Sequence, residues 1–185
     1  GGGRGRRRVD LSLRSTPAMR SESDATGELA AETRHRSSAV FLVVLAAILC
    51  AAGGLRFYRI DAQSFWHDEG NSARIAERPV RLIVEGAAGD IHPPGYYLLL
   101  AGWRSVFGES ERALRALSVV SGLGMVLITG LIGRRLFGPR VGLAAASLSA
   151  ASPFAIYYAQ EARMYALLGA VSAASTYAAL RAWDV

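Results

Sequence analysis

Residues 37–55 read SSAVFLVVLAAILCAAGGL and contain no charged side chain. A helix of about 20 mainly apolar residues crosses the hydrocarbon core of a bilayer, so this run predicts a first membrane span. Three later runs have a similar composition. With their flanking residues, the four predicted spans cover about 37–57, 114–133, 141–160 and 164–182. Their Gly, Ala and Ser content suits close packing of helices in lipid. The sequence therefore predicts an all-α, polytopic membrane protein.

The overall composition agrees with this fold class. Hydrophobic residues make up 51% of the 185 residues and charged residues 19%, against about 25% charged in soluble domains. The net charge of +6 is carried by Arg, because the chain contains no Lys. Many of these Arg residues lie in the first 36 residues or at the ends of apolar runs, where membrane topology places them. We therefore expect a lipid bilayer as a partner and no nucleic acid.

The first 36 residues differ sharply from the remainder. They are rich in Arg, Gly, Ser, Thr and Glu and nearly lack aromatic residues, so they offer little apolar area to bury on folding. This composition predicts a disordered, Arg-rich cytoplasmic tail at residues 1–36, followed by the membrane domain at 37–185. Because the chain begins with Gly and stops just after an apolar run, we expect it to be the N-terminal part of a longer protein.

A long loop, residues 56–115, separates the first two predicted spans and contains eight acidic and eight Arg residues. We expect two interfacial helices in it, at about 70–86, broken at Pro79, and at about 92–107, where the apolar run is too short for a span. Tyr96, Tyr97 and Trp103 are the aromatic residues expected at head-group depth. Arg-rich loops favour the cytoplasm, so the tail and residues 134–140 predict a cytoplasmic N-terminus and an extracytoplasmic 56–115 loop.

Ionisable and aromatic residues gather at three places on the predicted extracytoplasmic face. These are Trp66-His67-Asp68-Glu69, Asp90-Ile91-His92, and the stretch 157–165 with Tyr157, Tyr158, Gln160, Glu161, Arg163 and Tyr165. A carboxylate such as Asp68 is suited to take a proton from an acceptor hydroxyl. Arg163 and His92 are suited to hold a phosphate. This convergence favours group transfer from a phosphate-activated donor.

Structural interpretations of the same residues stay open. Asp68 or Glu69 can cap the helix that follows, and Arg163 can be an interfacial anchor. A divalent metal is a further alternative, although the spacing matches no metal motif such as HExxH. Its ligands would come from His67, Asp68, Glu69, Asp90 and His92. The sequence assigns no certain cofactor and no metal ligand.

Four motifs occur in a specific order along the chain. An Asp-Glu pair follows the first span, and then come DIHPPGYYLL at 90–99, GRRLFGPR at 133–140 and SPFAIYYAQEARMY at 152–165. Together they resemble the GT-C superfamily of membrane glycosyltransferases. The similarity is greatest to the group of protein O-mannosyltransferases and lipid A aminoarabinose transferases, including bacterial mannosyltransferase-like proteins. It covers roughly residues 40–182.

The resemblance implies inverting transfer of a hexose, such as mannose, from a polyprenyl-phosphate donor to a protein, lipid or glycan acceptor. The reaction would take place at the extracytoplasmic face of the cell membrane. Asp68 corresponds to the base or acceptor-orienting Asp of the family, Glu69 to its neighbour and Arg163 to the Arg of the third motif. His92 stands where some relatives contact the donor phosphate with Lys. Asp90, Tyr97 and Tyr165 complete the predicted substrate-binding residues.

The sequence therefore predicts a membrane glycosyltransferase with Asp68 and Glu69 as catalytic residues. Family members have more spans, so we expect this segment alone to be inactive. A transporter or flippase is one rival, although its charges would be expected in mid-span rather than at external helix ends. A non-catalytic membrane scaffold is the other, in which changes at Asp68 and Arg163 would alter stability alone.

Overall fold

The computed structural model describes residues 17–87 and 93–183, with the backbone alone for residues 17–34. All regular secondary structure in these ranges is helical, which confirms the all-α class. The helices are α1 (Pro17–Phe57), α2 (His67–Ala76), α3 (Val80–Ala87), α4 (Gly95–Phe107), α5 (Glu111–Phe137), α6 (Pro139–Ala151), α7 (Pro153–Ala159) and α8 (Tyr165–Trp183). The chain divides into two compact units, Gly1–Val40 and Phe41–Val185, and the second contains α2 to α8 with the last part of α1.

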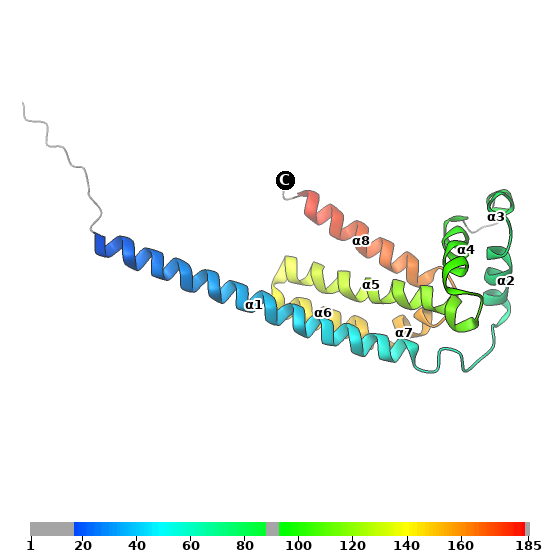
Figure 1. Cartoon of the computed structure of the whole chain (residues 1–185), viewed down its shortest axis with the longest axis horizontal. Coiled ribbons are helices and arrows are strands. Elements are labelled where there is room, and N and C mark those ends of the chain that lie inside the picture. The colour runs from blue at the N-terminus through cyan, green and yellow to red at the C-terminus, as the bar shows by residue number, and fades with distance from the viewer. Residues whose placement is uncertain (1–16, 88–92, 184–185) are drawn as a thin grey trace, which may run out of the picture. The chain divides into compact units, whose positions relative to one another are not determined.

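The second unit is built around α5, which packs along α6 and α8 (Figure 1). Buried apolar residues join α5 and α6 to the last part of α1: Phe41, Leu45, Ala52, Val126, Ala146 and Ala150. At the closest approach, a Cβ added to Gly142 of α6 would lie 2.6 Å from the carbonyl oxygen of Gly130 on α5. Small residues allow helices to pack this closely in lipid.

Two helical segments in the described part of the chain are long and apolar enough to cross a bilayer, His35–Phe57 and Glu111–Phe137. Helices α6 and α7 pass the same test only as a pair, bent by 60°. The third span predicted at 141–160 is thus present as two helices, because Pro153 has no N–H to continue α6 and Ser152 caps a new helix by accepting from Ala155 N. That the bent pair crosses the membrane as one span stays a prediction. Helix α8 coincides with the fourth predicted span, and the total number of spans stays a prediction.

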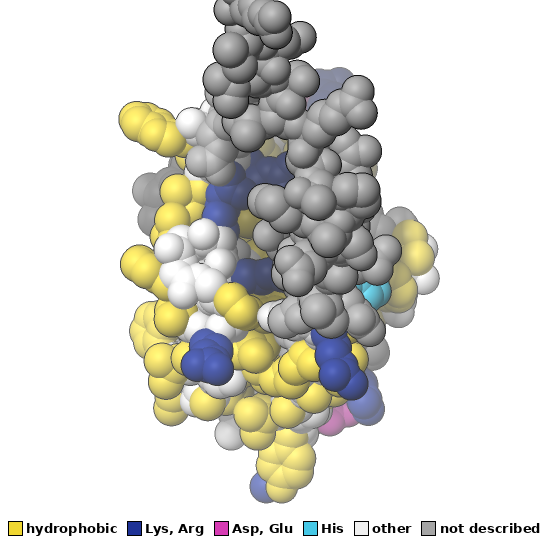
Figure 2. Space-filling model, turned by 90° about the vertical axis from the view of Figure 1, so that its left-hand side faces the viewer, with side chains coloured by type: hydrophobic (Ala, Val, Ile, Leu, Met, Phe, Trp, Pro, Cys, Tyr) yellow, Lys and Arg dark blue, Asp and Glu magenta, His cyan; other side chains and the backbone are white. Residues whose placement is uncertain are grey.

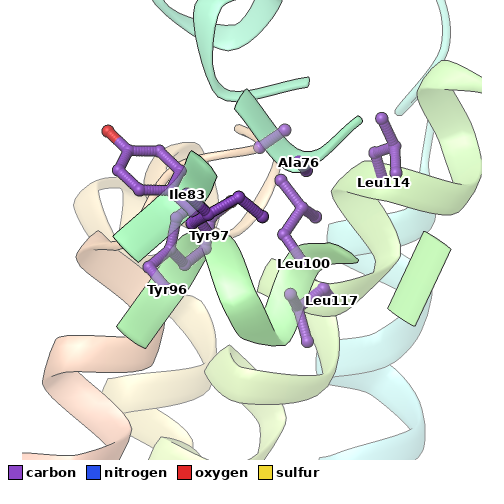
Figure 3. Packing of buried hydrophobic residues seen from close by; sticks show 8 residues of the cluster. Ala76, Ile83, Tyr96, Tyr97, Leu100, Leu114 and Leu117 are labelled. Atoms are coloured by element: carbon purple, nitrogen blue, oxygen red, sulfur yellow. The ribbon is translucent and has the colours of Figure 1, made fainter. Parts of the chain in front are cut away.

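Three short helices lie between the first two candidate spans, and of these α4 packs against the start of α5 while α2 and α3 pack on α4. The broken helix expected at 70–86 is present as α2 and α3, which are separated around Pro79. Helix α4 begins after Pro94. One cluster of buried apolar residues joins these helices to α5 and to the turn before α8 (Figure 3): Ala76, Ile83, Tyr96, Tyr97, Leu100, Leu114, Leu117 and Ala162.

The start of α1 differs from the sequence prediction. Residues 17–36 are helical and run directly into the first candidate span, whereas disorder was predicted for all of residues 1–36. Pro17 suits the first position of a helix, and the Ala, Leu, Glu and Arg residues that follow are good helix formers. Extending an existing helix also needs no new nucleation. Residues 1–16 lie outside the described residues.

Charges are unevenly distributed over the second unit. Among the side chains that the structure describes, every carboxylate lies between Asp61 and Glu111 or at Glu161. The other ends of α5 and α8 carry Arg134, Arg135 and Arg181. Figure 2 views the molecule from the left of Figure 1 and shows Arg side chains in dark blue among hydrophobic ones in yellow. The predicted membrane orientation is consistent with this distribution and stays a prediction.

Candidate functional site

The candidate site lies where the start of α2, the start of α5 and the turn between α7 and α8 meet. Helices α2 and α4 pack against each other, and α4 packs on α5 (Figure 1). Helix α2 begins after Trp66, which has an extended backbone and makes no side-chain capping bond. Asp68 and Glu69 occupy the first turn, where the helix dipole favours negative charge. Their carboxylates pair with Arg163 and Arg115 on other parts of the chain.

Glu69 and Arg115 form a buried ion pair that joins α2 to α5. Their side chains are 1% and 6% exposed. Arg115 donates from Nε to Glu69 Oε1 at 2.8 Å and from Nη2 to Oε2 at 2.7 Å, which is the strong bidentate geometry of a guanidinium and a carboxylate. The backbone N–H of Ala162 also donates to Oε1 at 2.8 Å. One carboxylate therefore holds α2, α5 and the α7–α8 turn together.

Arg115 also fixes the loop that leads into α2. Its Nη1 donates to the carbonyl oxygens of Ile60 at 2.7 Å and Gln63 at 2.8 Å. Its guanidinium carbon lies 5.1 Å from the centre of the Phe65 ring, within the range of a cation–π interaction. Every nitrogen of this buried guanidinium thus has a partner, as a buried charge requires.

Asp68 and Arg163 form a second ion pair that is far more accessible. Arg163 Nη1 lies 2.8 Å from Asp68 Oδ2, and the two side chains are 12% and 40% exposed. Arg163 Nη2 donates to the Tyr165 hydroxyl at 3.2 Å. The guanidinium carbon also lies 6.0 Å from the centre of the Trp66 ring. The pair therefore offers a second molecule both a carboxylate and a cation.

Two buried donors at this site have no hydrogen-bond partner among the described residues, Nε of Arg163 and the hydroxyl of Tyr96. Ser118 connects the region further, since its hydroxyl donates to the carbonyl oxygen of Arg163 at 3.2 Å. A buried polar group without a partner costs about 1–3 kcal/mol. The two donors therefore suit a ligand that brings hydrogen-bond acceptors.

The protonation states of these two donors follow from their surroundings. Burial raises the pKa of Tyr96 above its ordinary value, and the positive charge of Arg163 opposes this shift only in part. Tyr96 is therefore a neutral donor. Burial lowers the pKa of Arg163, but the Tyr165 hydroxyl and the negative charge of Asp68 act more strongly together and raise it. Arg163 is therefore a permanent cation.

The structure brings together three of the residues predicted from sequence, Asp68, Arg163 and Tyr165. Glu69 lies behind them in its pair with Arg115. Tyr97 is 6% exposed and packs in the apolar cluster, with its ring centre 5.7 Å from that of Tyr96. Asp90 and His92 lie outside the described residues.

The predicted metal ligands do not form a cluster in the described part of the chain. No three side chains of His, Cys, Asp or Glu there are placed to hold a metal ion. The carboxylates of Asp68 and Glu69 face guanidinium groups instead. The candidate set also included Asp90 and His92, so a metal at this site stays the open alternative that the sequence leaves.

Sequence reasoning missed Arg115 and Tyr96. Arg115 enters the sequence prediction only as one of the eight Arg residues of the 56–115 loop, although a charged residue at an apolar helix is a candidate functional residue in its own right. That indication was available in the sequence. Tyr96 and Tyr97 were both assigned to head-group depth, and no spacing rule shows which of two adjacent Tyr residues faces a site.

Comparison with known proteins places this geometry in a family. A family model described as dolichyl-phosphate-mannose-protein mannosyltransferase matches residues 91–185, just over half of the chain. The chain belongs to this family. It is a membrane glycosyltransferase of the GT-C type, which confirms the resemblance seen in the sequence. The match includes Tyr96, Arg115 and Arg163, whereas Asp68 and Glu69 precede it. No curated protein and no solved structure matches the chain.

Proposed function

We propose that the protein transfers a hexose such as mannose from a polyprenyl-phosphate donor to a hydroxyl group of a protein, lipid or glycan acceptor. The observation that carries this proposal is the Asp68–Arg163 pair, in which a partly exposed carboxylate touches a cation. Two buried donors without partners lie at the same site. The description of the family names a lipid-phosphate-linked mannose as donor, and this chemistry suits the site.

Arg163 and Tyr96 bind the donor phosphate in this proposal. A phosphate presents several acceptor oxygens, and the guanidinium fork matches them in bidentate geometry. Nε of Arg163 and the Tyr96 hydroxyl would gain the partners that they lack. As the bond from the sugar to phosphate breaks, the fixed cation stabilises the negative charge on the departing lipid phosphate.

Asp68 is the general base. It accepts the proton of the acceptor hydroxyl while that oxygen attacks the anomeric carbon, and the phosphate oxygen leaves with the bonding electron pair. Inversion requires the attacking and leaving oxygens to lie on opposite faces of the sugar. The sugar therefore enters between Asp68 and Arg163 and separates them. A partly exposed ion pair is worth about 1 kcal/mol or less, so donor binding can offset its loss.

Glu69 takes a positioning role in this proposal. Both of its oxygens are engaged by Arg115, and one also by the N–H of Ala162. The pair holds Asp68, the preceding residue of α2, against the turn that carries Arg163. Tyr165 steadies the Arg163 guanidinium from the other side.

The proposed location is the cell membrane, with the N-terminus in the cytoplasm and the site on the extracytoplasmic face. This orientation is supported by the charge distribution, because the described carboxylates lie at the site end and Arg134 and Arg135 lie at the far end of α5. Short Arg-rich segments favour the cytoplasmic side.

The test is transfer of radiolabelled sugar from a polyprenyl-phosphate hexose in membranes that contain the complete gene product. Asp68→Asn at equal expression should lower transfer by about 100-fold or more, the usual contribution of a general base. Asp61→Asn is the matched control, since its carboxylate is 53% exposed and lies 3.9 Å from Arg112. Equal transfer by wild type and Asp68→Asn would refute the base assignment. No transfer from any of several donors would favour a transporter or a scaffold.

A further inference from the structure

Arg56 is an unusual residue for the last turn of a membrane-spanning helix. Its side chain is fully buried, at 0% exposure, although a cation at such a place is costly. The hydrogen bonds found for its guanidinium go to backbone carbonyl oxygens. This choice of partners distinguishes it from Arg115 and Arg163, which pair with carboxylates.

Two of the three carbonyl partners of Arg56 lie at the break between α6 and α7, and the third, Ala52, lies one turn earlier in α1. Nη1 donates to the carbonyl oxygens of Ala150 at 3.1 Å and Ala52 at 3.3 Å, and Nη2 to that of Ser149 at 3.3 Å. In an unbroken helix the Ser149 carbonyl would bind the N–H four residues later, but that residue is Pro153, which has none. Arg56 thus satisfies carbonyl groups that the 60° bend leaves without helical partners.

A second cap joins the same elements the other way, from the residue after α7 to the end of α1. Gln160, directly after α7, donates from Nε2 to the carbonyl oxygens of Tyr58 at 3.0 Å, Arg56 at 3.1 Å and Leu55 at 3.5 Å. The carbonyl groups of Leu55 and Arg56 are among the last of α1 and have no intrahelical donors, and Tyr58 lies one residue past the end of this helix. Helix α1 therefore caps α6, and the residue after α7 caps α1.

Helix α5 leaves room for this arrangement. A Cβ added to Gly122 would lie 3.2 Å from Arg56 Nε and 3.0 Å from the Cβ of Ala159. Both distances are shorter than ordinary van der Waals contact, so a larger residue would press on Arg56 and on Ala159, the residue before Gln160. The reciprocal caps thus form one packed unit with α5.

We propose that Arg56 and Gln160 are positioning residues for the transfer reaction. Gln160 precedes Arg163 by three residues, and Arg56 lies in the last turn of α1, just before the loop that leads to Asp68. The reciprocal caps therefore fix, relative to each other, the two segments whose charged groups meet at 2.8 Å. The predicted effect of these two residues on sugar transfer rests on the proposed function. Their effect on the separation of the two segments does not, and it is measured independently.

The experiment uses the complete gene product with Cys50→Ser, which removes the one cysteine of this chain, and with every native cysteine outside this segment also replaced. Nitroxide labels on Ser64→Cys and Leu168→Cys, two exposed positions on the two segments, report their separation by electron paramagnetic resonance. Arg56→Met should broaden or shift the distance distribution and lower kcat by about 100-fold, as a misplacement of about 1 Å does. The KM for the donor should change far less.

Two variants serve as controls for Arg56→Met. Arg56→Lys keeps a cationic donor and should recover much of the distribution and of kcat. Arg59→Met removes an exposed Arg three residues later and should change neither. Gln160→Met removes the opposite cap without changing charge and should act like Arg56→Met, which keeps the test valid if Arg56→Met does not fold.

The outcomes separate this inference from the proposed function. An unchanged distance distribution in Arg56→Met and Gln160→Met overturns it, whatever their activity. Equal losses in Arg56→Lys and Arg56→Met also overturn it, because the donor role predicts rescue. A changed distribution in a protein whose wild type transfers no sugar refutes the proposed function and leaves the positioning of the two segments established.

Discussion

Replacing Glu69 by Gln tests whether the buried ion pair supports the site. The change keeps the side-chain volume and removes the negative charge opposite Arg115, whose side chain is only 6% exposed. Removing one partner of a buried pair costs about 3–5 kcal/mol. Gln retains a carbonyl oxygen for the N–H of Ala162, so we expect the lower end, about 3 kcal/mol. That equals about a 100-fold shift of the unfolding equilibrium.

The measurement is equilibrium unfolding of the purified protein in mixed micelles titrated with sodium dodecyl sulfate, followed by tryptophan fluorescence. Asp68→Asn is the matched comparison, because it makes the same chemical change one residue earlier. Its carboxylate is 40% exposed, so we expect a loss of about 1 kcal/mol or less. The reasoning would be refuted if Glu69→Gln cost less than Asp68→Asn, or if the two were equal.

A double variant sharpens the same prediction. Glu69→Met with Arg115→Met removes both charges, and a buried pair replaced by apolar residues often loses little stability. Here the carbonyl groups of Ile60 and Gln63 would lose their Arg115 donor, so recovery should be partial. A double variant no more stable than Glu69→Met alone would show that the bonds to the loop outweigh the ion pair.

Three further predictions concern other parts of the second unit. Gly142→Ala should lower the free energy of unfolding by about 1–3 kcal/mol, because its Cβ would lie 2.6 Å from the Gly130 carbonyl oxygen on α5. Gly124→Ala is the control: its Cβ meets nothing within 4 Å, so it should be neutral or stabilising in the same unfolding assay. Tyr96→Phe removes a buried hydroxyl without a partner, so stability should not fall while KM for the lipid-phosphate donor rises; a clear loss of stability would contradict this. Pro153→Ala restores a backbone N–H that can continue α6, so Arg56→Met should cost less stability in that background. A double-mutant cycle of the two changes should give a coupling energy of about 0.5–3 kcal/mol. The absence of coupling would show that Arg56 does not stabilise the helix break.

The main helices were predictable because apolar runs of sufficient length are a property of composition. The fold diverged from prediction where a local backbone rule outweighed composition. Residues 141–160 are free of charge, yet Pro153 divides them into two helices. Residues 17–36 are polar, yet they extend an existing helix. Both outcomes depend on hydrogen bonds between neighbouring turns, which a count of apolar residues does not include.

The residues of the site were partly predictable, whereas their pairing was not. Asp68 and Arg163 stood out through motifs, and the structure pairs them across 95 positions of sequence. Arg115 lies 46 positions from Glu69, and no spacing rule links the start of α2 with the start of α5. Such pairs arise from tertiary packing, here from the apolar cluster that seats α2 and α4 on α5.

The adjacent acids of the Asp-Glu motif have different surroundings because of helix geometry. Successive residues of an α-helix point about 100° apart, so at the start of α2 one carboxylate turns toward α5 while the other stays partly open to solvent. A buried carboxylate held by three hydrogen bonds is ill suited to exchange protons with a substrate, but it holds its surroundings firmly. The exposed neighbour has the opposite properties. A short motif can thus combine a fixed anchor with a reactive group, and this explains why Asp68 rather than Glu69 is the proposed base.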